Sequence, residues 1–509
     1  MNNFLSTETL IIELLIIVTL VAIAVRRLRV PYTVALVLVG LALTAQNSIR
    51  INLTPELILS IFVPPLVFEA ALHINFSDLH DQLTEILLLA VPGIIITTLM
   101  VGGLLNLFTP LALPIAIIFG ALISATDPVA VVAMFRTMGV SKKLAVLVES
   151  ESLLNDGTAI VAFNIALMVA ASGHFSFING VSDFLRISVG GTAIGLVFGW
   201  LVSNLIARID DYLIETSLTT ILAFGVYILA EDLHFSGVLA VVAAGLVTGN
   251  LSPKGMSPTT RIVITNFWEY VAFLANSLVF LIIGLQINLS ALLNSWKPVL
   301  IAIATVVLVR AVVVYGMGLM INRFSNRIPT SWLHVINWSG LRGAIALALV
   351  ASLPSSLGPE RELLSHMAFG VVLFTLLVQS TSMNSLIHRL KLITRTPEQI
   401  EFERRHARLT AARASMNHLE RRHSEGLISS QAWEIIKVQL SDQLASLSQQ
   451  MKDVLTSVPD IHTEELASAQ KDGLRAQMST LLQLRHDGII SQDVFEELSA
   501  EVNSKLDQV

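Results

Sequence analysis

Residues 142–172 read KKLAVLVESESLLNDGTAIVAFNIALMVAAS. The stretch is mostly apolar and longer than the roughly 20 helical residues that cross the hydrocarbon core of a bilayer. It nevertheless carries two carboxylates, Glu151 and Asp156, well inside the run. Ionisable side chains at membrane depth are costly and usually mark a transport pathway or a buried ion pair. This stretch therefore predicts a helical membrane protein with a polar site inside the bilayer.

The whole chain has the composition of a protein that lipid solvates. Of its 509 residues 54% are hydrophobic and 14% charged, and the mean hydropathy is +0.72. Soluble domains carry about a quarter charged residues. The net charge of -6 provides no basic surface for a nucleic-acid partner. The chain has no cysteine, which excludes disulfides, thiolate metal sites and cysteine nucleophiles.

Apolar runs of spanning length follow one another to about residue 390. They are continuous, whereas a transmembrane β-barrel shows weak alternation in segments of about ten residues. We therefore expect an all-α polytopic membrane protein with about thirteen transmembrane helices. The runs lie at roughly 8–25, 31–46, 55–73, 84–107, 112–136, 142–172, 182–208, 215–231, 235–250, 258–288, 297–322, 330–354 and 362–389.

Positive charge in the loops predicts the orientation. Three arginines follow the first apolar run instead of preceding it, so this run is a spanning helix and not a cleavable signal. With the N-terminus outside, loops and tail on the cytoplasmic side hold fourteen Lys and Arg against four opposite, in agreement with the positive-inside rule. We expect a multi-pass protein of the cell (inner or plasma) membrane. The fourteen are Arg26, Arg27, Arg29, Arg136, Lys142, Lys143, Arg208, Lys254, Arg261, Arg323, Arg327, Arg389, Lys391 and Arg395; the four are Arg50, Arg186, Lys297 and Arg361.

The composition changes after Arg395, where polar residues dominate and Leu and Ile recur at helical spacing. We therefore expect a transmembrane domain at 1–395 and a soluble, helical, cytoplasmic tail at 396–509. The tail contains a weak repeat of a glycine turn, a serine cap and an aromatic anchor. A small helical hairpin domain and a regulatory or dimerising module both fit it. The repeated segments are Gly426 to Glu434 and, 62 residues later, Gly488 to Glu496.

Two predicted spans contain helix breakers. Asp127-Pro128 interrupts the fifth, and Arg342 lies between Gly340 and Gly343 in the twelfth. The two spans hold matching places in two six-helix halves, at about 8–172 and 215–389. A single linking helix between the halves gives the second half the opposite orientation in the membrane. Interrupted spans at matching positions of two such inverted repeats indicate a binding site between them. Asp127 could bind an ion there or neutralise the ends of broken helices.

The sixth predicted span carries the clearest ligand set. Ser152, Asn155 and Asp156 lie three and four residues apart, so their oxygens share one helix face. Such oxygens suit an alkali cation, whereas Mg²⁺ and Ca²⁺ need more carboxylates and retain water. Glu151 lies on a neighbouring face, where an arginine partner is the more economical interpretation. Four acids lie well inside the spans, Glu69, Asp127, Glu151 and Asp156, with two bases, Arg310 and Arg342.

These motifs together resemble those of the sodium/proton exchangers of the bacterial NhaP and eukaryotic NHE type. They are Val63-Pro64-Pro65 with Phe68-Glu69, Thr126-Asp127-Pro128, Glu151-Ser152-Leu-Leu-Asn155-Asp156 and Gly340-Leu341-Arg342-Gly343. The likeness covers about residues 8–390 and leaves out the tail. It implies thirteen helices, a homodimer formed through one domain, and a mobile core domain with two crossing discontinuous helices.

The resemblance also implies roles for the residues of the site. Asp156 would carry the cation and the proton, with Asp127, Ser152, Asn155, Thr126 and Glu69 around the ion. Glu151 would form a structural ion pair with Arg310. Asparagine at position 155 accompanies electroneutral exchange in this family, whereas an electrogenic branch has Asp there.

We therefore expect antiport of Na⁺, or of Li⁺ or K⁺, against H⁺, with a role in pH and cation homeostasis and without a cofactor or enzymatic activity. A cation channel would favour carboxylate rings or a carbonyl filter, and no filter-like segment occurs. An anion or solute carrier using Arg310 and Arg342 would not need four acids. A membrane sensor whose activity resides in the tail would need none of the four buried acids.

Overall fold

The computed structural model of the chain describes residues 2–25, 31–46, 58–172, 176–209, 211–252, 256, 258–287, 289–324, 328–393, 397–457 and 489–506, with single residues and short pieces between 470 and 485. The chain forms two compact units, Met1–Ile393 and Thr394–Val509, so the division falls two residues before the predicted one. Regular structure in the described residues is helical, apart from an isolated antiparallel bridge between Val140 and Ile393. Several residues named above lie outside this description: Arg26, Arg27, Arg29, Arg50, Lys254, Arg327, Arg395 and Gly488.

The helices of the first unit follow the apolar runs closely. Several runs are divided by a kink, a π-turn or a break. The elements are α1 (Asn2–Val25), α2 (Tyr32–Gln46), η1 (Ile58–Phe62), α4 (Val63–His73), α5 (Phe76–His80), α6 (Leu83–Ala90), α7 (Pro92–Phe108), α8 (Leu113–Leu122), α9 (Val129–Met138), α10 (Lys142–Ser172), α11 (Phe177–Ile206), α12 (Tyr212–Asp232), α13 (Gly237–Leu251), α14 (Pro258–Gln286), α15 (Leu289–Asn294), α16 (Trp296–Phe324), α17 (Thr330–Trp338), α18 (Ala344–Ala351), η3 (Ser355–Leu357), α19 (Pro359–Phe374), η4 (Thr375–Ser380) and α20 (Thr381–Arg389).

Seven helical segments among the described residues are long and apolar enough to cross a membrane. The all-helical class is confirmed, whereas the count of thirteen spans stays a prediction. Six shorter apolar helices accompany the seven, among them α8, α9 and α13. The seven are Leu83–Phe108, Lys142–Ser172, Ile178–Ile206, Tyr212–Asp232, Thr260–Gln286, Trp296–Arg323 and Pro359–Arg389.

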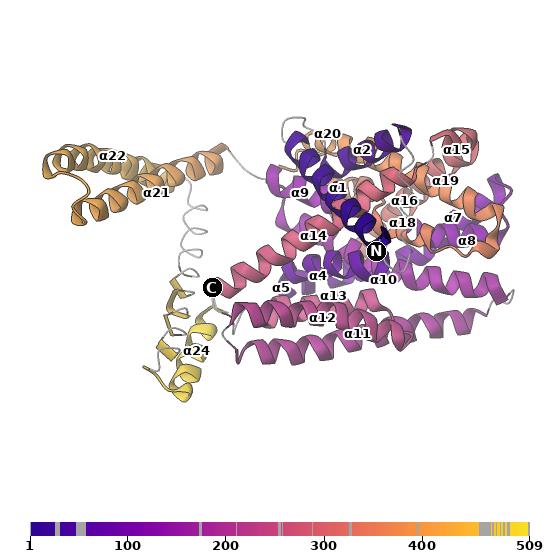
Figure 1. Ribbon diagram of the computed structural model, residues 1–509, viewed down its shortest axis with the longest axis horizontal. Coiled ribbons are helices and arrows are strands. Elements are labelled where there is room, and N and C mark those ends of the chain that lie inside the picture. Colours follow the sequence, from indigo (N-terminus) through magenta and orange to yellow (C-terminus); the bar gives the residue numbers. More distant parts are fainter. Residues whose placement is uncertain are drawn as a thin grey trace. The chain divides into compact units, whose positions relative to one another are not determined.

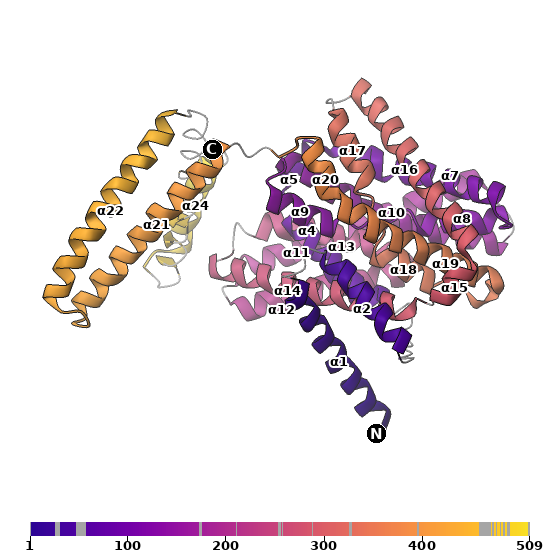
Figure 2. The same cartoon turned by 90° about the horizontal axis from the view of Figure 1, so that it is seen from above.

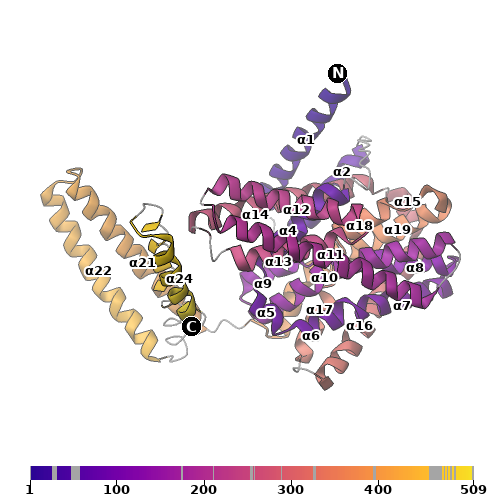
Figure 3. The ribbon, with the colours of Figure 1, turned by 90° about the horizontal axis from the view of Figure 1, so that it is seen from below.

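The helices of the first unit pack as two groups. The first group comprises α1, α2, α4 and α11–α14; in it α13 contacts α4, α11 and α12, and α14 contacts α2 and α4. The second group comprises α6–α10 and α16–α20, with α7 packed on α8 and α16 on α7 and α19. Figure 1 shows α11 and α12 alongside each other at the outer side of the first group, and in Figure 2 the N-terminal end of α1 projects from the body. Figure 3 shows α7 and α8 of the second group at the other end from α9.

Close packing inside the first group depends on small residues. Gly40 of α2 faces Gly284 of α14, and a Cβ added to Gly40 would lie 2.8 Å from the Gly284 Cα. In lipid, where apolar surface gains little from leaving the solvent, such contacts between backbones hold helices together. The two glycines therefore let α2 and α14 approach each other closely.

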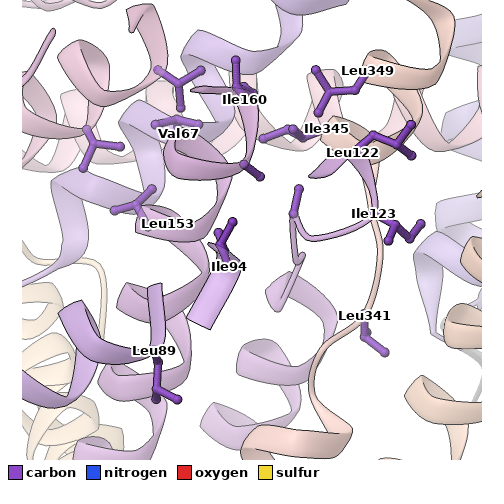
Figure 4. Packing of buried hydrophobic residues seen from close by; sticks show 14 of the residues in the cluster. Val67, Leu89, Ile94, Leu122, Ile123, Leu153, Ile160, Leu341, Ile345 and Leu349 are labelled. Carbon is purple, nitrogen blue, oxygen red and sulfur yellow. The ribbon is translucent and has the colours of Figure 1, made fainter. Parts of the chain in front are cut away.

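The second group contains two broken helices. α8 ends at Leu122 and α9 begins at Val129, while α17 ends at Trp338 and α18 begins at Ala344. The extended segments between them meet, and the backbone N–H of Asp127 donates to the Leu341 carbonyl over 2.8 Å. Figure 4 shows buried apolar side chains around this meeting point, which come from both broken helices, from α10, and from α4, α6 and α7. The breaks occur where Pro128 and the glycines around Arg342 predict them.

The second unit contains the helical hairpin of α21 (Pro397–Ser424) and α22 (Ser430–Ser457), and a later helix, α24 (Gln492–Leu506). The repeat proposed from sequence reappears in local contacts. The His423 ring stacks on Trp433 with centroids 5.4 Å apart, and 62 residues later the Arg485 guanidinium lies 4.4 Å from the Phe495 ring centroid. In both segments the aromatic residue thus contacts an imidazole or guanidinium group ten residues before it in the sequence.

Candidate functional site

The meeting point of the broken helices is electrostatically balanced by two side chains. Arg342 is 1% exposed, and its Nη1 donates to the carbonyls of Ser124 and Ala125, over 2.9 and 3.1 Å. These carbonyls follow the C-terminal end of α8, where the helix dipole is negative. Asp127 lies before the opposite, positive end, and its Oδ1 accepts from the backbone N–H of Val129 over 3.1 Å. Both half-helix ends are thereby neutralised inside the unit.

The polar residues of α10 contact this crossing directly. The Ser152 hydroxyl lies 3.1 Å from the Thr126 hydroxyl and also donates to the Thr126 carbonyl. The Asn155 side-chain amide donates to the Thr126 hydroxyl over 3.2 Å and to Glu151 Oε1 over 2.6 Å. The hydroxyls and the amide that we predicted around a cation therefore lie together, with Thr126 at the centre.

Two acceptor oxygens in this network remain open. Asp156 Oδ1 and Asn155 Oδ1 are buried and have no hydrogen-bond partner in the described part of the chain. A buried acceptor without a donor is destabilising unless water or a bound species satisfies it. The charged groups that act most on Asp156 are Asp127, Glu151 and Arg342. The unmatched carboxylate oxygen therefore identifies the position in this site that is best prepared for a cation or a proton.

A pocket of about 620 Å³ leads to this position and lies between the two helix groups. Thr126, Asp127, Ser152 and Asp156 line it from the second group. The first group contributes Glu69 of α4 and further residues of α2 and α14. The second-group wall also includes Gly343, where an added Cβ would overlap the Asp127 side chain. Asn155 does not line the pocket and supports it from behind.

Acidic side chains gather elsewhere on the pocket wall. Glu69, 26% exposed, has its Oε1 3.3 Å from His73 Nδ1, and His73 Nε2 lies 3.8 Å from Glu269 Oε1 on α14. Glu149 of α10 pairs with Arg136 of α9 over 3.3 Å, and both line the pocket. A pocket wall rich in carboxylates attracts cations from water.

Glu151 and Arg310 lie behind the site and form a two-pronged ion pair. Arg310 Nη1 and Nη2 donate to Glu151 Oε1 and Oε2 over 2.9 and 3.4 Å, and Nη2 also donates to the Ile336 carbonyl over 3.1 Å. The side chain of Arg310 is 10% exposed and that of Glu151 is 3% exposed. A Cβ at the position of Gly340 would lie 3.0 Å from Arg310 Nε, so a larger residue would crowd the guanidinium group.

The structure also brings in residues that sequence analysis did not single out. The Thr375 hydroxyl accepts from the backbone N–H of Arg342 over 3.2 Å. Tyr32, Thr33 and Asn276 line the pocket from the first group. Each is a polar residue inside or at the end of an apolar run, which is a detectable signal, but such residues are too common in spans to identify a site alone.

Comparison with known proteins places this arrangement in a family. The family described as "Sodium/hydrogen exchanger, transmembrane" matches residues 14–388. The chain is 37% identical over 471 residues to the Na⁺/H⁺ antiporter ApNhaP of Aphanothece halophytica, covering 92% of this chain and 90% of that one. It is 39% identical over 451 residues to the low-affinity Na⁺/H⁺ antiporter NhaS1 of Synechocystis, covering 87% and 85%.

A solved structure shows the same fold. The sodium proton antiporter MjNhaP1 from Methanocaldococcus jannaschii superposes with a TM-score of 0.65 at 22% identity, covering 78% of this chain and 100% of that one. The family match spans well over half of the chain and includes every residue of the site described above. The chain therefore belongs to the sodium/hydrogen exchanger family, whose members are membrane transporters and not enzymes.

Proposed function

We propose that the chain exchanges Na⁺ for H⁺ across the cell membrane, with Asp156 as the carrier of both ions. The observation that carries this proposal is the buried, unpartnered Asp156 oxygen in a pocket between two helix groups. Thr126, Ser152 and Asp127 would supply further oxygens to the cation, Asn155 would hold Thr126 in place, and Glu69 would contribute from the opposite wall. The relatives named as Na⁺/H⁺ antiporters support the choice of ions.

Coupling follows from electrostatics at one carboxylate. A carboxylate can hold a proton or an alkali cation, and the two compete because each neutralises the same charge. The neutral, loaded site crosses a hydrophobic barrier at much lower cost than the bare anion. Exchange of one ligand for the other on the two sides of the membrane therefore couples the two fluxes.

Access would alternate by movement of the second helix group against the first. The pocket walls belong to different groups, so a shift between them opens one side and closes the other. The half-helix ends remain capped by Arg342 and Asp127 within the second group, which lets that group move as a unit. In this proposal the first group forms the homodimer, the N-terminus lies outside, the tail is cytoplasmic, and the two halves of the unit are inverted repeats.

Flux measurement in proteoliposomes tests this function and the choice of cation. With an imposed pH gradient, addition of Na⁺ should dissipate the gradient, as reported by dequenching of a pH dye. We expect Na⁺ to drive the dissipation, and parallel additions of Li⁺ and of K⁺ determine which other alkali cations the site accepts. Vesicles without protein are the control. Gradient dissipation that does not depend on any alkali cation would contradict the proposal.

We predict that exchange is electroneutral. Asn155 does not titrate and Glu151 is paired with Arg310, so one proton would move against one cation at Asp156. An uncompensated charge would be driven by about 2.3 kcal/mol per 100 mV. A valinomycin-imposed potential should therefore leave the exchange rate unchanged. Acceleration in the direction that carries extra protons to the negative side would show that a second acid, Asp127 or Glu69, also carries one.

We predict that the tail modulates exchange without being required for it. The tail is a separate compact unit that begins at Thr394, and the first unit contains the whole pocket. A chain that ends at Arg395 should still form the dimer and exchange ions, with at most a shifted pH dependence or apparent affinity. Complete loss of flux in a truncated protein that elutes and melts normally would place the tail within the transport machinery.

A further inference from the structure

A second, very small cavity adjoins Gly340 and Arg342 at the crossing and shares no lining residue with the cation pocket. Its volume is about 10 Å³, and its polar lining comprises Arg310, Arg342, Thr375 and Gln379. A cavity of this size is about the smallest that holds one water molecule, which needs two to four polar partners to remain there. None of these four side chains lines the larger pocket.

Three buried polar atoms on these side chains have no hydrogen-bond partner among the described residues: Arg310 Nε, Arg342 Nε and Gln379 Oε1. Taken as whole residues, Arg310, Arg342 and Gln379 are 8%, 1% and 4% exposed, so bulk water does not satisfy these atoms. Thr375 is already satisfied, since its hydroxyl accepts from the Arg342 N–H and donates to the Val372 carbonyl. The cavity thus presents two N–H donors and one amide acceptor that lack partners.

The chemistry of these three groups distinguishes between possible occupants. A water molecule can accept from both Nε–H groups and donate to the Gln379 oxygen at the same time. A halide could accept from the arginines but would face the lone pairs of Gln379 Oε1, and it is larger than the cavity. We propose that one internal water molecule occupies this cavity and joins Arg310, Arg342 and Gln379.

The local backbone explains why the cavity exists at this place. Residues Thr375–Ser380 form a π-turn within the long helix of α19 and α20. Such wide turns often occur at functional sites, and they align residues four apart on one face, as are Thr375 and Gln379. Gly340 leaves the other wall open, because a side chain there would meet Arg310 Nε.

The water gives Gln379 a positioning role. Arg342 holds the carbonyl end of α8 beside the cation pocket, and Arg310 holds Glu151, which in turn accepts from Asn155. A water fixed by Gln379 restrains the orientation of both guanidinium groups from the side opposite their ion-pair and carbonyl contacts. Loss of such supporting contacts behind a site typically reduces activity on the order of ten-fold or more.

The occupant can be identified in crystals of the full chain grown in chloride and in bromide. We expect one density peak within hydrogen-bond distance of the three unmatched atoms in both salts, without anomalous signal in bromide. An anomalous bromide peak would overturn the proposal in favour of an anion site. An empty cavity at a resolution that shows other buried waters would overturn it as well. Neither result bears on whether the chain transports ions.

The positioning role rests on the proposed function and is tested by Gln379→Met, which keeps the length of the side chain and removes the acceptor. We expect the peak to vanish and the maximal exchange rate to fall on the order of ten-fold per folded transporter, with the KM for Na⁺ little changed. Gln379→Glu, which retains an acceptor oxygen, should recover most of the rate.

Ser380→Ala is the matched control, because Ser380 is buried next to Gln379 with an unpartnered hydroxyl but lies outside the cavity lining. It should exchange ions at the wild-type rate. A Gln379→Met protein with the wild-type rate would overturn the positioning role. Absence of exchange in the wild type as well would instead contradict the proposed function.

Discussion

Asp156→Asn should abolish exchange and leave the protein folded. The substitution keeps the shape of the side chain but removes the charge for which a proton and a cation compete. Asp156 has no ion-pair partner within 4 Å in the described part of the chain and its Oδ1 is unmatched, so the substitution breaks no salt bridge. We expect cation-driven dequenching of the pH dye to fall below about a tenth of the wild-type rate, because neutral Asn cannot alternate between two ligands.

Asp78→Asn is a matched control for this change. Asp78 is also an aspartate of the first unit, but it pairs with Lys142 over 2.6 Å, its side chain is 32% exposed, and it does not line the pocket. It should exchange ions at nearly the wild-type rate. If Asp156→Asn retained more than about a tenth of the flux, Asp156 would not be the carrier, and Asp127 would be the next candidate, since it is the other carboxylate at the crossing.

The helices and their interruptions were predictable from local sequence. Hydropathy placed the ends of most helices within a few residues, because a span must be apolar over the thickness of the bilayer. Pro128 and the glycines on either side of Arg342 marked the breaks, since proline removes a backbone donor and glycine weakens a helix. The family assignment from the four motifs is confirmed. The roles of the individual site residues stay predictions.

The partners of the buried arginines were harder to predict. Arg342 donates to backbone carbonyls that follow the end of α8. Every residue has a backbone carbonyl, so the sequence does not show which carbonyls an arginine will contact. Asn155 as a cation ligand stays a prediction, but the hydrogen bonds from its side-chain NH₂ group to Thr126 and Glu151 did not follow from its spacing. Spacing along a helix shows which residues share a face. It does not show which distant segment of the chain packs against that face. Apart from Glu69, the pocket wall formed by the first group was missed for the same reason.

Glu151→Gln should destabilise the protein more than any other single substitution considered so far. Glu151 accepts three hydrogen bonds, two from Arg310 and one from Asn155 at 2.6 Å. Neutralising it leaves the Arg310 guanidinium buried without a counter-charge, which costs about 3–5 kcal/mol in comparable pairs. Asp156→Asn removes an unpaired buried charge instead, so it should leave the melting temperature unchanged or raise it. Melting in detergent, followed by tryptophan fluorescence, measures the difference directly.

The double variant Glu151→Gln with Arg310→Met should recover part of this loss, because both buried charges are then absent. Recovery should be incomplete, since Arg310 also donates to the Ile336 carbonyl and that acceptor loses its partner. Breaking the Asp78–Lys142 pair by Asp78→Asn is the control; the lysine of this pair is 75% exposed, and pairs near the surface contribute at most about 1 kcal/mol. If the single variant melts with the wild type, or if the loss in the double variant equals the sum of the losses in the Glu151→Gln and Arg310→Met single variants, Glu151 and Arg310 are not energetically coupled. A recovered melting temperature without recovered flux would show that the pair also holds Asn155 and Thr126 in place for the cation, in addition to stabilising the fold.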